Sequence, residues 1–329
     1  MILVLLIGLR REVGADWWNY LTIFRNIGRG GFGDALHAST EPAYGLLNWI
    51  AAKAGWGIWF PNLVCGALFT WGLLAFSRQQ PNPLLAIAVA IPYFVIGVGM
   101  GYTRQSAALG LVLLAMIECV RGRQARMYLF LILAPTFHTS AIIAIPLLAL
   151  VAVRGGLVTT ALVMVVGAIM ILQFSGRIQA KLDFYGSRSI SSSGAILRLA
   201  MNLIPSLIYL SFRQRFTRNP AELRLWTIIA WTAVGSMLLL FFFESTIIVD
   251  RMGLYLIPIQ IFVFSRLPSV LGARGRPSLL LIFVILAYSL AVQVAWLSLG
   301  SWGHAWLPYR NYLWSNALEK NAPRWFRMR

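Results

Sequence analysis

Apolar segments recur along nearly the whole chain, and short loops that carry arginine separate many of them. A bilayer core about 30 Å thick needs roughly 20 apolar residues in one helix, and its interior admits only helices or closed barrels. The segments 57–76, 84–100 and 278–299 approach that length and predict transmembrane helices. Further apolar segments cover 1–9, 106–120, 127–137, 138–153, 157–174, 196–212, 226–243 and 253–265.

The composition agrees with a chain that lies mostly in lipid. Hydrophobic residues make up 59% of it and charged residues 12%, whereas soluble domains carry about 25% charged residues. The two cysteines lie inside apolar segments, which excludes a disulfide framework. We expect an all-α polytopic membrane protein with about 10–11 transmembrane or re-entrant helices, forming one transmembrane domain over residues 1–329.

The net charge of +18 would suggest nucleic acid in a soluble protein. Here the basic residues fall largely in short loops between apolar segments, which is typical of the cytoplasmic loops of membrane proteins. Zinc-finger, basic-helix and RNA-binding sequence patterns are absent, so no nucleic-acid partner is expected. No two histidines have the spacing of metal ligands, and neither a metal nor another cofactor is expected.

Five arginine clusters set the predicted orientation if all of them face the cytoplasm. They are Arg78; Arg121, Arg123 and Arg126; Arg154; Arg213, Arg215 and Arg218; and Arg266, Arg274 and Arg276. Three longer segments then lie on the opposite side: a loop at 10–56 with an interfacial helix near 44–54, a loop at 175–195 and a tail at 300–329. Arg10 and Arg11 fit this orientation poorly.

The orientation requires two crossings between Arg126 and Arg154, because both arginines lie on one side. Pro135 and the residues after it could form the turn of such a hairpin. The alternative is one span of residues 127–153 that is kinked at Pro135, and it would invert every later loop. We favour the hairpin, because the inverted arrangement places the later basic loops outside.

The stretch GYTRQSAA (101–108) places an arginine between two apolar segments. A charge at bilayer depth costs roughly 2.5–3.5 kcal/mol on insertion scales. The predicted orientation instead puts Arg104 at a surface turn, where Gly101 turns the chain and Ser106 helps to start the next helix. Arg104 is either an interfacial anchor or a clamp for an anion, because a guanidinium fork matches phosphate oxygens.

Two further arginines begin predicted helices on the same side. Arg251 follows an acid in STIIVDRMGLY, and it either binds an anion or forms a local pair with Asp250. Arg198 in GAILRLA either faces the same site or anchors its helix at the interface. Arg310 in WLPYRNYLW belongs to a late aromatic segment that suits the membrane surface.

Three groups could accept a proton on this side of the membrane. His138 stands at the start of a predicted helix in FHTSAIIAIP, where a neutral imidazole can act as a base. Asp16 in GADWWNY and Glu41 in STEPAYGLLN lie among aromatic residues that suit sugar rings. Helix capping is the alternative role for His138 and Asp16, and a turn before proline is that of Glu41. Between the two acids, IGRGGFGD (27–34) lacks the GK[ST] of a phosphate-binding loop and is expected to be flexible.

The order of these motifs resembles the EpsG family of Wzy-like bacterial polysaccharide polymerases over about residues 13–314. The motifs are GADWWNYLTIF, TEPAYGLLNWIAAKAGW, YTRQSAALGLVLLA, FHTSAIIAIPLL, DRMGLYLIP and WLPYRNYL. The resemblance implies a membrane glycosyltransferase with a GT-C-like architecture in the bacterial inner membrane, with its active site facing the periplasm. It would join undecaprenyl-pyrophosphate-linked oligosaccharide repeat units.

The resemblance also implies roles for particular residues. His138, Glu41 and Asp16 are the candidate catalytic residues, and Arg104 and Arg251 are the main candidates to bind pyrophosphate. Arg198, Arg310, Tyr255 and Tyr309 complete the predicted substrate-binding set. The expected partners are undecaprenyl-pyrophosphate-linked glycans, membrane lipid, a chain-length regulator and export machinery.

Three other functions remain open at this point. An O-antigen ligase would use the same donor but would carry a larger periplasmic loop than any found here. A flippase or other transporter would show internal repeats and charges along a central path, and neither is evident. A membrane acyltransferase could use a single histidine, although the arginines favour a phosphorylated lipid.

Overall fold

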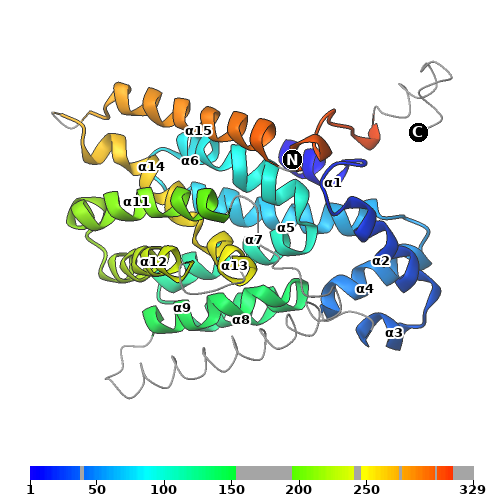
Figure 1. Ribbon diagram of the computed structural model, residues 1–329. Coiled ribbons are helices and arrows are strands. Elements are labelled where there is room, and N and C mark those ends of the chain that lie inside the picture. The colour runs from blue at the N-terminus through cyan, green and yellow to red at the C-terminus, as the bar shows by residue number, and fades with distance from the viewer. Residues whose placement is uncertain (38–40, 153–194, 241–245, 274–275, 301, 314–329) are drawn as a thin grey trace.

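The structure is a computed structural model that describes residues 1–329 except 38–40, 153–194, 241–245, 274–275, 301 and 314–329. The described residues form helices joined by short connections and contain no β-strand, which confirms the all-α class (Figure 1). By length and composition, five described helices could cross a membrane: Trp59–Ser77, Thr103–Val120, Ala195–Phe216, Val249–Val270 and Leu279–Leu299. The chain is therefore polytopic, as the apolar segments predict.

Most helices lie within a few residues of the predicted segments. The first part holds α1 (Ile2–Gly8), α2 (Trp17–Arg29), α3 (Phe32–His37), α4 (Pro42–Lys53), α5 (Trp59–Ser77), α6 (Pro83–Ala90) and the π-helix η1 (Ile91–Gly99). The middle holds α7 (Thr103–Val120), α8 (Gln124–Phe137), η2 (Thr139–Ile143) and α9 (Ala144–Ala152). The last part holds α11 (Ala195–Phe216), α12 (Pro220–Leu239), α13 (Thr246–Leu256), α14 (Pro258–Val270), α15 (Leu279–Leu299) and η3 (Gly303–Ala305). The predicted segment 157–174 and the loop before Ala195 lie outside the described residues.

Helix α7 forms the centre of the bundle, because 89% of its 18-residue apolar stretch is buried. It packs tightly against α5, where two glycines let the backbones meet. A Cβ on Gly72 would lie 2.1 Å from the carbonyl oxygen of Gly110, and one on Gly110 would lie 2.4 Å from that of Leu68. Small residues are a usual means of close helix packing in membranes, so this contact fixes α5 against α7.

The stretch from 124 to 152 forms the predicted hairpin. Helix α8 ends at Phe137, His138 is extended with φ −154° and ψ 120°, and the chain returns through η2 and α9. Helices α8 and α9 pack against each other (Figure 1). Pro135 lies inside the last turn of α8, so the break falls at His138 and not at the proline.

Described members of four of the arginine clusters that set the predicted orientation gather at one end of the bundle, which we call the basic end, while Arg154 lies outside the described residues. Arg78 and Arg121 line one cavity there, and Arg215 and Arg266 line a second cavity that shares Gln79 with the first. The short helices α2, α3 and α4 cluster at the opposite end, at the right of Figure 1. We call this opposite end the Glu41 end.

The N-terminal region is more helical than the sequence indicates. The predicted loop at 10–56 contains the expected helix as α4, and it also contains α2 and α3. The flexible loop expected at 27–34 is therefore wrong for most of its length, since α2 runs to Arg29 and α3 begins at Phe32. The Asp34 carboxylate accepts a hydrogen bond from the Gly31 N–H at 2.8 Å. This contact ties the two glycines between α2 and α3 to the first turn of α3.

Residues 96–106 contact the late segment around Trp306 and begin α7. A Cβ on Gly101 would lie 2.6 Å from the Trp306 ring, so glycine is required here by close contact. The indole N–H of Trp306 donates to the Ile96 carbonyl at 2.8 Å. Ser106 does not cap α7 as expected: its hydroxyl donates to the Thr103 carbonyl at 2.9 Å, and the helix begins at Thr103. The earlier start places Arg104 in the first turn of α7.

Candidate active site

Glu41 lies at the centre of a cluster of polar side chains at the Glu41 end. It precedes α4, but its side chain caps no α4 N–H. One carboxylate oxygen, Oε2, pairs with the Arg104 guanidinium, while Oε1 lies 2.8 Å from His138 Nδ1 and 3.5 Å from Thr139 N. The Glu41 side chain is only 4% exposed. Its carboxylate therefore joins the starts of α4 and α7 to the turn after α8.

The geometry around His138 assigns its tautomer. Its Nε2 atom lies 3.5 Å from Nη1 of Arg251. Because a guanidinium can only donate, Nε2 must be the acceptor and Nδ1 must carry the proton that is donated to Glu41. His138 lies in the turn between α8 and η2, and burial lowers its pKa, with Arg251 and Arg104 acting in the same direction and Glu41 opposing. At neutral pH the ring is a neutral base with its lone pair on Nε2.

Arg104 is held from two sides. Its carboxylate partner is Glu41, and its guanidinium carbon lies 5.5 Å from the centre of the Tyr20 ring and 5.8 Å from that of Tyr44. Cation–π contacts of this kind stabilise a charge that is removed from water. Burial would raise the pKa of Glu41, but the His138 hydrogen bond and the Arg104 charge outweigh it and lower that pKa to about 2. Glu41 stays ionised at any physiological pH.

A chain of hydrogen bonds connects Arg251 to residues of α7, η2 and α13. Its Nη1 atom lies 3.4 Å from Oε1 of Gln105, and Gln105 Nε2 lies 3.4 Å from the Ser140 hydroxyl. That hydroxyl is 2.9 Å from the hydroxyl of Tyr255, a fully buried residue of α13. The predicted site residue Tyr255 thus lies at the buried end of this hydrogen-bond chain.

Asp16 precedes α2 and is half-buried near the same charges. Burial raises its pKa, while the positive charges of Arg251 and Arg104 oppose that rise. The structure therefore brings together all three predicted catalytic residues and the two main predicted pyrophosphate ligands.

Arg198 lies beside this cluster and has a different partner. Its Nε and Nη2 atoms lie 2.6 Å and 3.0 Å from the two carboxylate oxygens of Asp250. Asp250 thus pairs with an arginine 52 residues away, while its neighbour Arg251 contacts His138 and Gln105. The local Asp250–Arg251 pair considered from the sequence is replaced by this longer-range pair.

Tyr309 and Arg310 contact the N-terminal segment of the chain. The Tyr309 hydroxyl donates to the Leu6 carbonyl at 2.7 Å, and Arg310 Nη1 lies 2.5 Å from a carboxylate oxygen of Glu12. An isolated β-bridge between Arg10 and Asn311 lies between these contacts. In this structure both residues hold the late segment against the N-terminal one, and their predicted part in substrate binding stays a prediction.

Sequence reasoning missed Gln105, Tyr20 and Tyr44. Each has a signal in the spacing: Gln105 follows Arg104 directly, Tyr20 lies one helical turn after Asp16, and Tyr44 lies one turn after Glu41. Residues three or four apart share a helix face, so a functional residue before a helix marks its next turn as well. These three residues hold the arginines of the cluster in place.

The cluster combines a base with fixed positive charge. His138 offers a lone pair, Glu41 orients the ring and stays anionic, and Arg104 and Arg251 supply guanidinium groups for an oxyanion. Among the residues that the structure describes, no three His, Cys, Asp or Glu side chains gather to hold a metal ion. The base and the two guanidinium groups suit proton transfer beside a phosphate group.

The comparisons with known proteins agree with the motif order. The model of the EpsG family matches residues 1–311. No curated protein and no solved structure matches the chain. Because the family match covers nearly the whole chain, and the described helices are those of a polytopic membrane protein, the chain belongs to the EpsG family, a family of Wzy-like exopolysaccharide polymerases.

Proposed function

We propose that the protein polymerises undecaprenyl-pyrophosphate-linked oligosaccharide repeat units at the periplasmic face of the bacterial inner membrane. The observation that carries this proposal is the Glu41 carboxylate, which holds His138 and Arg104 together while Arg251 faces the other side of the imidazole. Family membership supports the polymer product, and the base and arginines support the donor type. The arginine clusters at the basic end support a periplasmic Glu41 end.

The chemistry is a glycosyl transfer between two lipid-linked molecules. A hydroxyl oxygen of the acceptor repeat attacks the anomeric carbon of the donor glycan, and the bond from that carbon to pyrophosphate breaks. The electron pair leaves with the lipid pyrophosphate. Arg251 turns from Nε2 of His138 to this pyrophosphate, which frees the Nε2 lone pair, and the hydroxyl proton passes to Nε2. Direct displacement inverts the anomeric configuration.

Each member of the cluster has a distinct part in this step. Glu41 fixes the proton on Nδ1, so that only Nε2 is available as the base. Arg251 stabilises the negative charge that develops on the leaving pyrophosphate, and Arg104 adds positive charge beside it. Asp16 is the candidate for binding acceptor hydroxyls. A chain-length regulator and export machinery are the expected partners of such an enzyme.

The test is complementation of a strain that lacks the gene. Full-length Arg104→Ala, His138→Ala and Arg251→Ala proteins are expressed at equal levels, and the glycan is blotted. A polymerase predicts that single repeats accumulate on the lipid and long chains disappear. Arg25→Ala, an exposed arginine of α2 at the same end, is the matched control and keeps normal chains.

Three results would contradict the proposal. Normal polymer from all three variants would remove these residues from the site. Loss of the lipid-linked repeat from the periplasm, with single repeats retained inside, would indicate a flippase. Transfer of the glycan to lipid A core without polymerisation would indicate a ligase.

A further inference from the structure

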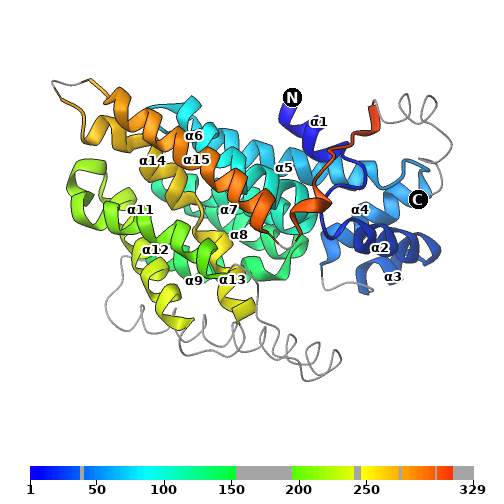
Figure 2. The ribbon, with the colours of Figure 1, turned by 45° about the horizontal axis from the view of Figure 1, so that its top comes forward.

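A groove of about 570 Å³ lies beside the cluster. Its walls come from α11, α15, the π-helix η1 and the segment around η3. Helix α15 lies along α6 and α14 (Figure 2). Most lining side chains are apolar, and the groove also holds the Arg198–Asp250 ion pair. The lining includes Tyr93, Tyr102, Leu197, Met201, Ala291, Ala295, Trp296 and Trp306.

One wall of the groove belongs to the helix that is least covered by protein. Ile285 and Ser289 are the buried residues of α15, and only 11% of the apolar stretch of this helix is buried against protein. A helix this apolar and this exposed has lipid as its natural surroundings. The groove therefore borders the part of the bundle that faces acyl chains.

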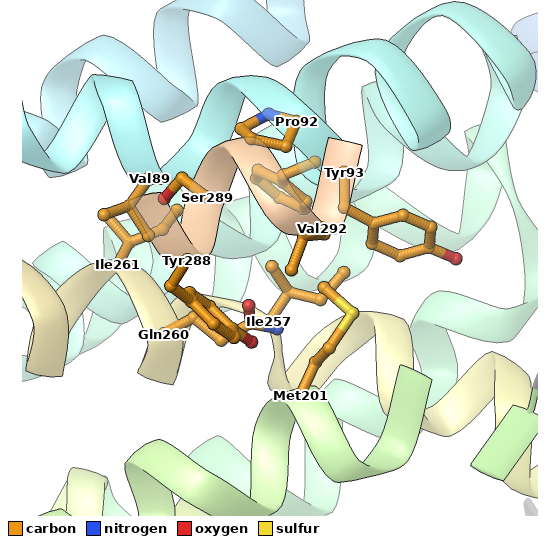
Figure 3. Close-up of a pocket in the computed structure, with 11 residues that line it drawn as sticks. Val89, Pro92, Tyr93, Met201, Ile257, Gln260, Ile261, Tyr288, Ser289 and Val292 are labelled. Atoms are coloured by element: carbon orange, nitrogen blue, oxygen red, sulfur yellow. The ribbon is translucent and has the colours of Figure 1, made fainter. Parts of the chain in front are cut away.

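A small cavity of about 10 Å³ adjoins the groove. Tyr93, Met201, Tyr288 and Val292 line this cavity (Figure 3), and they also line the groove. That volume is about one water molecule at most. A chain-like occupant of the groove therefore cannot continue through this cavity.

Three pairs of neighbouring residues connect the groove to the cluster. Tyr102 lines the groove, and Arg104 two positions later binds Glu41. Asp250 lines the groove, and Arg251 beside it contacts His138. Likewise Ala15 lines the groove, and the charge of the adjacent Asp16 is coupled to those of Arg104 and Arg251. The groove and the cluster thus share their boundary on three separate segments.

Apolar walls, a charged end and contact with the reactive cluster match one kind of molecule. An isoprenoid chain suits the apolar walls, and its phosphate suits the guanidinium of Arg198. The Arg198 side chain is only 20% exposed, so salt would screen its attraction for a phosphate only weakly.

We propose that this groove binds the isoprenoid tail of a polyprenyl-phosphate-linked substrate and that Arg198 holds its phosphate next to Arg251. The proposal rests on the proposed function, and it adds a lateral path from the membrane into the site. Asp250 has two roles in this arrangement: it keeps Arg198 in place, and it gives way to the phosphate when a substrate arrives. The sugar then projects toward Glu41 and His138.

The test measures lipid binding without sugar or turnover. Purified full-length protein in nanodiscs is crosslinked with a photoreactive polyprenyl phosphate, and the labelled peptides are mapped. Ala295→Trp fills the groove with an indole ring and is expected to reduce labelling about tenfold, because the ring takes the space of the isoprenoid tail. Val294→Trp, on the exposed face of the same helix, is the matched control and keeps wild-type labelling.

A second pair of variants tests the phosphate contact without filling space. Arg198→Gln removes the charge and is expected to reduce labelling about tenfold, while Arg198→Lys retains part of it. Equal labelling of Ala295→Trp and Val294→Trp, or of Arg198→Gln and wild type, overturns the proposal. Competition by excess phosphatidylglycerol as effective as that by unlabelled polyprenyl phosphate also overturns it, because the groove would then bind ordinary lipid.

The two proposals can fail separately. Labelling in the groove together with normal polymer from the His138→Ala protein would remove the proposed chemistry and keep the lipid site. Loss of polymer in His138→Ala together with unchanged labelling in both groove variants would do the reverse.

Discussion

His138 and Glu41 are 97 positions apart in the sequence, yet Nδ1 of the imidazole lies 2.8 Å from Oε1 of the carboxylate. The Arg104 guanidinium binds the other oxygen of the same carboxylate. A buried acid with two such partners orients the base and keeps an arginine in place at once. The contact joins the N-terminal helices to the α8–η2 turn, so its loss affects both chemistry and structure.

Glu41→Gln is expected to reduce polymer formation by about 10²-fold or more, the lower range for loss of acid–base function. The neutral amide holds the ring less firmly and leaves the Arg104 charge without its buried partner. Turnover of a lipid-linked repeat by the purified protein provides the measurement. Glu118→Gln, at the basic end beside Arg121, is the matched control and retains full turnover.

The activity is expected to persist below pH 6.5, the ordinary pKa of a histidine. Burial lowers the pKa of His138, so the neutral base survives to a lower pH than a free imidazole would. Glu41 raises the pKa of His138, so Glu41→Gln should move the acidic limb of the pH–rate profile further down. An acidic limb above pH 6.5 in the wild type would contradict this.

The lowered pKa of His138 should also make the stability of the protein depend on pH. Acidic conditions that the activity tolerates should reduce the stability. Because the folded state favours neutral His138, the unfolded chain binds a proton more readily, and stability falls as the pH decreases below 6.5. His138→Gln removes this contribution. The melting temperature of the variant should therefore depend less on pH between 6.5 and 5 than that of the wild type, measured in one detergent.

Gly110→Ala is expected to destabilise the protein by about 1–3 kcal/mol, because its Cβ meets the α5 backbone. Gly235→Ala is the matched control: a Cβ there has no neighbour within 4 Å, and alanine favours the helix. Thermal unfolding in detergent measures both. Equal melting temperatures for the two variants would mean that α5 and α7 do not pack closely in solution.

Arg266→Lys is expected to cost about 1–3 kcal/mol of stability, because lysine cannot replace a bidentate guanidinium. Arg266 donates to both carboxylate oxygens of Glu222 and to the Phe216 carbonyl, and it lies 4.1 Å over the Phe262 ring. Arg121 forms a partly exposed ion pair with Glu118, three residues earlier. Arg121→Lys should therefore change the melting temperature little. A similar small change in both variants would contradict the assigned role of Arg266.

The sequence by itself determined the apolar helices, though not α2 and α3, and it grouped the candidate site residues at the end opposite the basic loops. Apolar length specifies the helices, because the bilayer requires every backbone group to be paired within its own segment. The hairpin around His138 follows from the placement of arginines, and so does the grouping of the basic loops. The same reasoning identified Glu41, Arg104, His138 and Arg251 as exceptional, since each is a polar group at the end of an apolar segment.

Only the tertiary structure decided which of these polar residues are partners. Hydrophobic patterning is a local property, whereas the Glu41–His138 and Arg198–Asp250 contacts join distant segments. It also decided that Arg10, which fitted the predicted orientation poorly, is fully buried with its guanidinium 2.6 Å from the Thr103 hydroxyl. Burial without water leaves a charge stable only where neighbouring helices supply its hydrogen bonds, and no pattern within one segment specifies those neighbours.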